Sequence, residues 1–173
     1  SHICNSLIDN GFKVSTIDNL STGNVNLIPK KVEHINCDIS EVDAKKIPHC
    51  DIVIGGFPCQ GFSLANLRRS VEDERNKLYL QFVRVLNEKK PAFFVAENVP
   101  GILSLDKGKV IEHIVDEFES CGYTVKYKLH HAADFGTPQS RKRVFIIGTR
   151  GDISENFELY ISWFSMFLCK NLI

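Results

Sequence analysis

Short apolar segments alternate along the chain with segments of helical character. Six stretches are rich in β-branched and aromatic residues and end in polar or glycine-containing turns, which predicts strands. These strands cover residues 12–18, 32–37, 51–56, 92–98, 123–132 and 143–149. The apolar positions of 78–86 fall on one helical face, and so do those of 110–118. We expect Asp106 to cap the 110–118 helix and Gly122 to end it.

Strands separated by helices of this length predict parallel pairing through right-handed crossovers. The expected fold class is therefore α/β, with a doubly wound and mostly parallel sheet. In such sheets ligands bind outside the carboxyl ends of the strands. Cys59, Glu97 and Asn98 lie at or just past such ends, so we expect them to meet in one crevice.

Composition narrows the class of protein without naming a partner. The 173 residues are 43% apolar and 24% charged, which is ordinary for one folded domain. Lysine plus arginine and aspartate plus glutamate both number 21, so net charge indicates neither a nucleic acid nor a membrane surface. The six cysteines form no CxxC pair and follow no secretory leader, which argues against a disulfide framework or a metal site. We expect a reducing, cytoplasmic compartment.

The segment "GGFPCQGFS", residues 55–63, places Cys59 in a loop directly after a predicted strand. Pro58 stiffens this loop, and the glycines allow close approach of the backbone to a ligand. A free thiol is mostly protonated at neutral pH, so a nucleophilic Cys59 needs positive charge or hydrogen-bond donors nearby. Two other segments could supply polar partners: "AENVP" with Glu97, and "QSRKR" with Arg141 and Arg143.

These three segments, in this order, resemble the signature blocks of the DNA cytosine-5 methyltransferase family. The resemblance runs from about Glu41 to Gly151 and includes the whole of "KKPAFFVAENVPGIL" and "AADFGTPQSRKRVFIIGTR". It implies a Rossmann-like catalytic domain that acts in DNA methylation of the restriction–modification type. The implied partner is double-stranded DNA with a cytosine-containing site, without a metal ion and without a membrane.

The resemblance also implies a role for each candidate residue. Cys59 is the nucleophile that adds to carbon 6 of cytosine, and Glu97 holds ring nitrogen 3 and the exocyclic amine. Arg141 contacts the cytosine carbonyl oxygen, and Arg143 fixes Glu97 and the loop. The target cytosine is flipped out of the duplex. The remaining substrate-side residues are Gln60, Ser63, Asn98 and Gln139.

The implied methyl donor is S-adenosylmethionine, bound at the strand ends. By resemblance Asp18 binds its ribose and Asp38 lies near its adenine. Pro58 and Leu78 line the same pocket.

The two ends of the chain depart from the family pattern. Residues 1–40 resemble the start of the extended short-chain dehydrogenase/reductase family, the nucleotide-sugar epimerases, in which Asp18 would hold the ribose of NAD. We expect a partial catalytic domain at 1–153 and an atypical apolar tail at 154–173. This layout lacks the family's glycine-rich first strand, its closing elements and a target-recognition domain, so we expect the chain to be inactive on its own.

Three alternatives stay open at this point. A transfer-RNA cytosine-5 methyltransferase uses the same thiol and glutamate, although the serine of "QGFS" favours the DNA branch. An NAD-binding epimerase would need a Tyr-x-x-x-Lys pair, which the sequence around Tyr79 and Tyr123 does not supply. A fragment that folds, or binds DNA weakly, without catalysis is the third.

Overall fold

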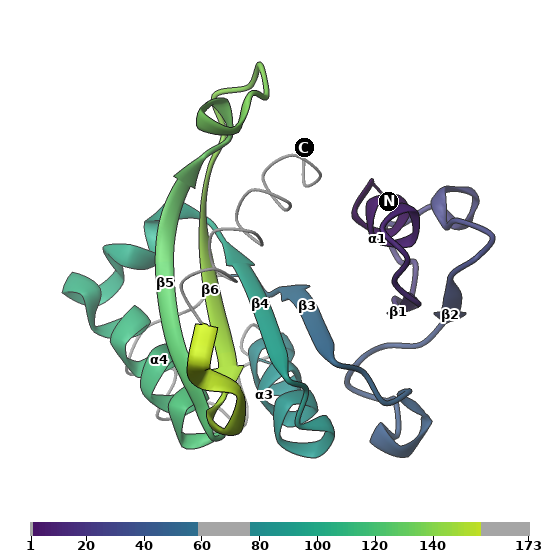
Figure 1. The fold of residues 1–173 in the computed structure, drawn as a ribbon, viewed down its shortest axis with the longest axis horizontal. Coiled ribbons are helices and arrows are strands. Elements are labelled where there is room, and N and C mark those ends of the chain that lie inside the picture. Colours follow the sequence, from purple (N-terminus) through teal and green to yellow (C-terminus); the bar gives the residue numbers. More distant parts are fainter. Residues whose placement is uncertain (1, 59–76, 157–173) are drawn as a thin grey trace.

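A computed structural model describes residues 2–58 and 77–156 of the chain (Figure 1). All six predicted strands are present, and each lies within or close to its expected bounds. The helices and strands are α1 (His2–Asp9), β1 (Ser15–Ile17), β2 (Glu33–Ile35), β3 (Ile52–Gly56), α3 (Lys77–Lys89), β4 (Phe93–Asn98), α4 (Lys109–Ser120), β5 (Tyr123–His131) and β6 (Lys142–Arg150). Short 3₁₀ turns connect them at Val25–Leu27, Ala44–Lys46, Pro100–Leu103, Leu105–Gly108, Ala132–Phe135 and Gly151–Asn156.

The described strands form two sheets. The larger has the order β3-β4-β6-β5, and the smaller contains β1 and β2 alone. β1 is parallel to β2 and β3 is parallel to β4, whereas β6 is antiparallel to both β4 and β5. Because β6 is reversed relative to both neighbours, β3, β4 and β5 all run in the same direction.

The α/β fold class is confirmed, with one correction to the expected pairing. The last two strands do not pair in parallel through a helix, because β5 and β6 form an antiparallel hairpin. Residues 132–141 connect them, and antiparallel strands can be joined by such a short link, whereas parallel strands need a longer crossover. The hairpin extends well beyond the other strands (Figure 1).

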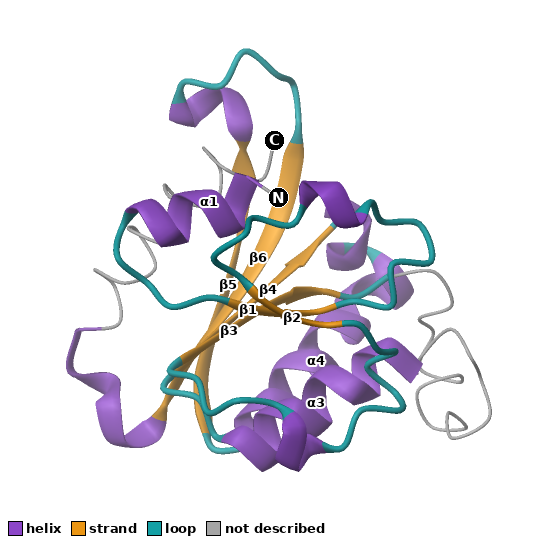
Figure 2. Ribbon diagram, turned by 90° about the vertical axis from the view of Figure 1, so that its right-hand side faces the viewer, coloured by secondary structure: helices purple, strands orange, loops and turns teal. Residues whose placement is uncertain are grey.

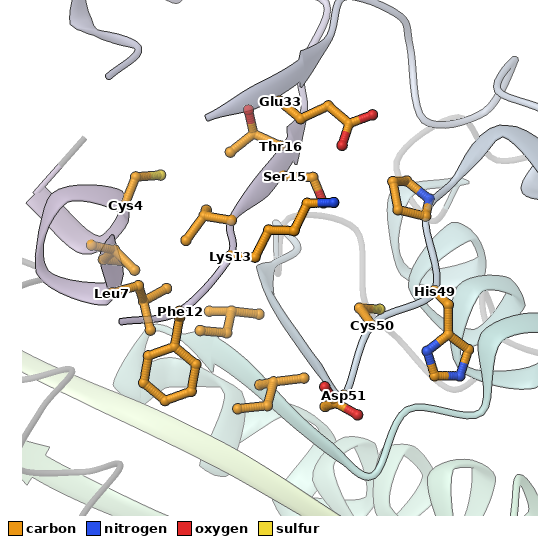
Figure 3. A pocket seen from close by; sticks show the side chains of 15 residues that line it. Cys4, Leu7, Phe12, Lys13, Ser15, Thr16, Glu33, His49, Cys50 and Asp51 are labelled. Atoms are coloured by element: carbon orange, nitrogen blue, oxygen red, sulfur yellow. The ribbon is translucent and has the colours of Figure 1, made fainter. Parts of the chain in front are cut away.

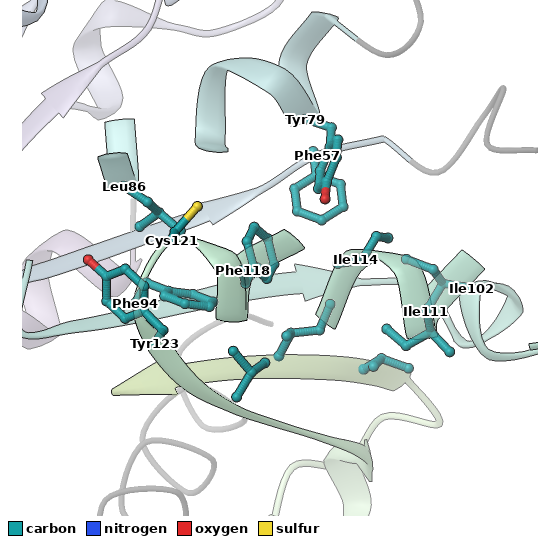
Figure 4. Packing of buried hydrophobic residues seen from close by; sticks show 14 of the residues in the cluster. Phe57, Tyr79, Leu86, Phe94, Ile102, Ile111, Ile114, Phe118, Cys121 and Tyr123 are labelled. Carbon is teal, nitrogen blue, oxygen red and sulfur yellow. The ribbon is translucent and has the colours of Figure 1, made fainter. Parts of the chain in front are cut away.

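Helices cover both faces of the larger sheet, as expected for a doubly wound fold (Figure 2). On one face α3 and α4 pack against Phe94, Ala96 and Ile146 around a core of aromatic rings (Figure 4). The rings of Phe94 and Phe118 are 4.8 Å apart between centroids. On the other face Leu7 of α1 packs with a second set of strand residues: Val95, Phe145 and Ile147.

The expected cap of α4 was wrong, and its expected end was right. Gly108, not Asp106, is the N-cap residue, and Asp106 has a φ of 47° and a ψ of 47° in the preceding turn. Asp106 thus lies two residues before the N-cap position, in a left-handed turn, and no side chain of the described residues makes a capping hydrogen bond to the first turn of α4. Gly122 follows the helix with a φ of +93°, a conformation that glycine adopts at low cost.

Within the described residues, no helix is long and apolar enough to cross a bilayer.

Candidate active site

Strand register brings three distant parts of the chain together at one end of the larger sheet. Gly56 of β3 pairs with Glu97 of β4, and Glu97 pairs with Phe145 of β6. One residue further on, Asn98 pairs with Val144. The last residue of β3, the glutamate of "AENVP" and the strand that follows "QSRKR" are therefore neighbours.

Two arginines converge on the carboxylate of Glu97. Arg143 Nε lies 2.6 Å from Glu97 Oε1, and Arg141 Nη2 lies 3.8 Å from the same oxygen. The side chains of Glu97 and Arg143 are each 24% exposed, so solvent screens this ion pair less than a surface pair. The arrangement fixes the carboxylate and concentrates positive charge beside it.

Arg141 also carries a hydrogen-bond donor without an acceptor. Its Nε atom is buried and has no hydrogen-bond partner in the part of the chain that the structure describes. The backbone at this position is held at both ends, because Arg141 N–H donates to Gln139 O and Arg141 O accepts from Ala132 N–H. Buried donors are normally satisfied, so this N–H is a candidate contact for a bound molecule.

Asn98 connects the end of β4 to the end of β3. The residue is 3% exposed, and its Nδ2 donates to the carbonyl oxygen of Phe57 at 2.9 Å. Its Oδ1 accepts from Val99 N–H at 2.9 Å. The ring of Phe57 packs against Tyr79, with centroids 5.0 Å apart. The backbone that leads into residue 59 is therefore fixed relative to Glu97 by a buried side chain.

Gly56 allows the end of β3 to lie close to Glu97. A Cβ atom at this position would lie 3.3 Å from both the backbone oxygen and the Oε2 atom of Glu97. A side chain here would press on the carboxylate, so glycine leaves Glu97 free to keep its position.

Three predicted site residues, Cys59, Gln60 and Ser63, lie outside the described residues, and their roles remain predictions. Gln139 is described, and its side chain is exposed at the hairpin tip. In the described structure Gln139 contacts Arg141 through its backbone only.

A cavity of about 500 Å³ lies between the smaller sheet, β3 and helix α3. Residues at the carboxyl ends of β1 and β3, among them Asp18 and Phe57, line it together with Leu78 of α3. Two of the four predicted donor-binding residues, Asp18 and Leu78, thus face this cavity. Pro58 and Asp38 are not among the lining residues.

Asp38 instead organises the turn after β2. Its Oδ1 accepts from the hydroxyl of Ser40 at 2.6 Å and from Ser40 N–H at 2.9 Å, and its Oδ2 accepts from Asn19 Nδ2 at 2.9 Å. The hydrogen bonds from Ser40, with a smaller contribution from Asn19, hold the pKa of the Asp38 carboxyl below its usual value. The carboxylate therefore connects the loops that follow β1 and β2.

A second cavity of about 500 Å³ lies on the α1 side of the gap between β1 and β3 (Figure 3). It is lined by Leu7, Phe12 and Thr16 on one side and by Cys50 and Ile52 on the other. Burial raises the pKa of the Cys50 thiol, so this cysteine is a poor nucleophile. Across residues 2–58 and 77–156, no group of three or more His, Cys, Asp or Glu side chains could hold a metal ion.

The sequence reasoning missed Gln81 and Arg84 of α3. Gln81 lines the same cavity as Asp18, and Arg84 donates a hydrogen bond to Gln81. The sequence alone indicates that Gln81 is unusual. It follows Leu78 by three positions and precedes Val85 by four, so this polar residue lies on the apolar face of the helix.

The family model for "C-5 cytosine-specific DNA methylase" matches residues 24–166. The chain belongs to this family. The match begins before about residue 41, where the sequence resemblance was expected to begin, so residues 24–40 lie within it.

Curated relatives agree with this family. The chain is 50% identical over 121 residues to the type II methyltransferase M.BsuRI of Bacillus subtilis, which is 70% of this chain and 27% of that protein. It is 47% identical over 122 residues to the type II methyltransferase M.NgoFVII of Neisseria gonorrhoeae, which is 69% of this chain and 33% of that protein. The chain thus spans about a quarter to a third of the length of these relatives.

A solved structure agrees with the fold. The chain superimposes on the S. pombe Dnmt2 methyltransferase with a TM-score of 0.65 at 25% identity, over 87% of this chain and 48% of that one.

Proposed function

We propose that the chain forms part of the catalytic domain of a DNA cytosine-5 methyltransferase of the restriction–modification type. The observation that carries this proposal is the contact of Arg141 and Arg143 with Glu97, beside the strand end that leads into Cys59. The similarity to type II methyltransferases, at about twice the sequence identity of the Dnmt2 structure, favours DNA as the substrate.

The proposed reaction begins with Cys59, whose thiolate adds to carbon 6 of a cytosine. The addition makes carbon 5 nucleophilic, so carbon 5 can accept a methyl group. Loss of the carbon 5 proton and of the Cys59 sulfur from carbon 6 then restores the aromatic ring. S-adenosylmethionine, when bound, supplies the methyl group from its sulfonium centre.

Glu97 and the arginines hold the cytosine during these steps. Glu97 pairs with ring nitrogen 3 and the exocyclic amine, and a proton at nitrogen 3 neutralises the charge that develops on the ring. The unpaired Nε–H of Arg141 is a suitable donor for the cytosine carbonyl oxygen. Arg143, at 2.6 Å from Glu97, keeps the carboxylate in position. These edges of the base are paired or stacked in a duplex, so the cytosine must be flipped out.

The cavity at the ends of β1 and β3 fits the methyl donor. It combines apolar walls from Leu78 and Phe82 with the carboxylate of Asp18, and a nucleoside needs both kinds of contact. Asp18 would bind the ribose hydroxyls. Asp38 would act from the adjacent turn rather than from the cavity wall.

The test uses a chimera in which this chain replaces the matched segment of the Bacillus subtilis relative. In the presence of S-adenosylmethionine, DNA that carries 5-fluorocytosine at the methylated position should trap a covalent complex, because after methyl transfer fluorine cannot leave carbon 5 as the proton does. The Cys59→Ser chimera should form no adduct, and the Cys50→Ser chimera should form it normally. An adduct that persists in Cys59→Ser would overturn the assignment of the nucleophile.

A second measurement separates the methyltransferase from the epimerase alternative. Calorimetry on the same chimera should detect S-adenosylmethionine and no NAD. The opposite preference would reject the proposed function.

A further inference from the structure

Two side chains one turn apart on α3 form a fixed polar pair at the wall of the cavity described above. Arg84 Nε donates to Gln81 Oε1 at 2.6 Å. An arginine side chain has only donors, so the oxygen of the Gln81 carboxamide must face it. The NH₂ group of Gln81 therefore points away from Arg84.

Arg84 is itself held in place from the opposite side. Its Nη2 donates to Ile39 O at 2.6 Å, and its Nη1 donates to Val42 O at 3.3 Å. Glu88 Oε2 lies 3.7 Å from the same Nη1. The guanidinium thus joins α3 to the segment that follows Asp38, and it keeps Gln81 in one orientation before any ligand arrives.

Gln81 stands out among the residues of α3 that line this cavity. Its neighbours there are Leu78, Phe82 and Val85, which are all apolar. The Nε2 atom of Gln81 has no hydrogen-bond partner in the described part of the chain. A carboxamide donor with a fixed orientation in an apolar wall is a typical specificity contact of a small-molecule site.

We propose that Gln81 contacts the ligand of this cavity, and that its NH₂ group donates a hydrogen bond to an acceptor atom of a nucleoside. Arg84 is a positioning residue that acts through Gln81. The nucleoside identity rests on the proposed function, whereas the orientation of Gln81 rests on the contacts of Arg84 alone.

Nuclear magnetic resonance of the ¹⁵N-labelled 173-residue chain tests this inference, because it detects weak binding without any catalysis. Gln81→Ala identifies the side-chain NH₂ signals of Gln81, and it should also shift the Nε–H signal of Arg84 before ligand is added. On titration with S-adenosylhomocysteine to millimolar concentration, the Gln81 NH₂ signals should shift.

Affinity measurements then separate the two roles. Loss of one neutral hydrogen bond should weaken binding in Gln81→Ala by about 3- to 10-fold. Arg84→Met should weaken it by a similar factor, and the double variant should lose no more than Gln81→Ala, because Arg84 acts through Gln81. Asn87→Ala is the matched control on the same helix, because Asn87 is exposed and does not line the cavity, and its affinity should be unchanged.

The outcomes distinguish this inference from the proposed function. Normal binding with unmoved Gln81 signals and full affinity in Gln81→Ala would overturn the inference and leave the function standing. Binding of NAD but not of S-adenosylhomocysteine would reject the function. Additive losses in the double variant would show that Arg84 acts independently, and absence of binding by either nucleoside would reject the inference.

Discussion

The larger and the smaller sheet differ in how their strands are held. β3, β4, β5 and β6 contain five, six, nine and nine residues, and their central strands are buried between helices on both faces. β1 and β2 contain three residues each, and each begins at an exposed position, Ser15 or Glu33. In the described structure β1 and β3 share no ladder, and both cavities lie between them.

This difference corresponds to a division of tasks. Glu97 and Asn98 lie on β4, a central strand of the larger sheet, where register and packing fix them, as chemistry that depends on exact geometry requires. The candidate donor cavity lies where the two sheets meet, between segments connected by side chains such as Arg84 rather than by a strand ladder. We therefore expect perturbations of the larger sheet to affect the chemical step and those of the smaller sheet to affect ligand binding.

The largest expected effect is on catalysis. Glu97→Gln keeps the shape of the side chain and removes its titratable proton, so methyl transfer by the chimera should slow by about 100-fold or more. Asp18→Asn, at the smaller sheet, should mainly raise the KM for the methyl donor. Single-turnover rates and donor titrations measure the two effects, and unchanged turnover in Glu97→Gln would reduce this residue to a structural role.

The next effect concerns stability. A Cβ atom on Gly148 of β6 would lie 1.9 Å from Cε1 of Phe94, inside the main core. Gly148→Ala should therefore lower the free energy of unfolding by about 1–3 kcal/mol, the usual cost of overpacking a core. Gly101→Ala is the matched control, because a Cβ atom at Gly101 would have no neighbouring atom within 4 Å. Urea unfolding measures both, and equal stability of the two variants would show that the core around Phe94 can relax.

The strands and the ends that carry Glu97 and Asn98 were predictable because both depend on local patterns. The order of the strands and the reversal of β6 were not, since pairing is decided by contacts between distant segments. Asp106 was misjudged because a left-handed turn at Asp106 and Lys107 precedes the helix, and side-chain preference does not report that turn.

The contacts of Arg84 show a second limit. Its acceptors, Ile39 O and Val42 O, are backbone atoms 45 and 42 residues away. A backbone carbonyl acceptor leaves no requirement on residue type, so no pattern in the sequence indicates such a contact. In contrast, the position of the polar Gln81 on an apolar helix face can be predicted from the sequence. Its place in the wall of the cavity is known only from the structure.

A strand added between β1 and β3 should reduce the difference in how firmly the strands of the two sheets are held. Among the described residues neither β1 nor β3 has a ladder partner on the side of the gap, and the gap is bounded by Leu7 of α1 on one face and Phe82 of α3 on the other. An appended segment of five or six apolar β-branched residues should pair there and add about 1 kcal/mol of stability, roughly 2–4 °C in the melting temperature. The same segment with a central proline should add nothing, because proline cannot donate to a ladder. Equal melting temperatures of the two fusions would mean that the edges are not available.

The smallest expected effect is a local response to acid in the smaller sheet. The pKa of the Asp38 carboxyl is lowered in the fold, chiefly by Ser40, so its contribution to stability is present above its usual pKa of 3.8 and is lost as the pH falls through the lowered value. Protonation should release Ser40 N–H and the Asn19 side chain, and should loosen the loops after β1 and β2 while β4 and β6 stay protected. Amide hydrogen exchange from pH 5 to below pH 3 measures this, because the lowered pKa lies below 3.8. The exchange rate of Ser40 N–H is compared with that of Ile146 N–H after correction for intrinsic rates. Asp38→Asn should show the loosened loops already at pH 5 and no further change on acidification. Simultaneous loss of protection in both sheets would show that they unfold as one unit and that the division between them is not energetic.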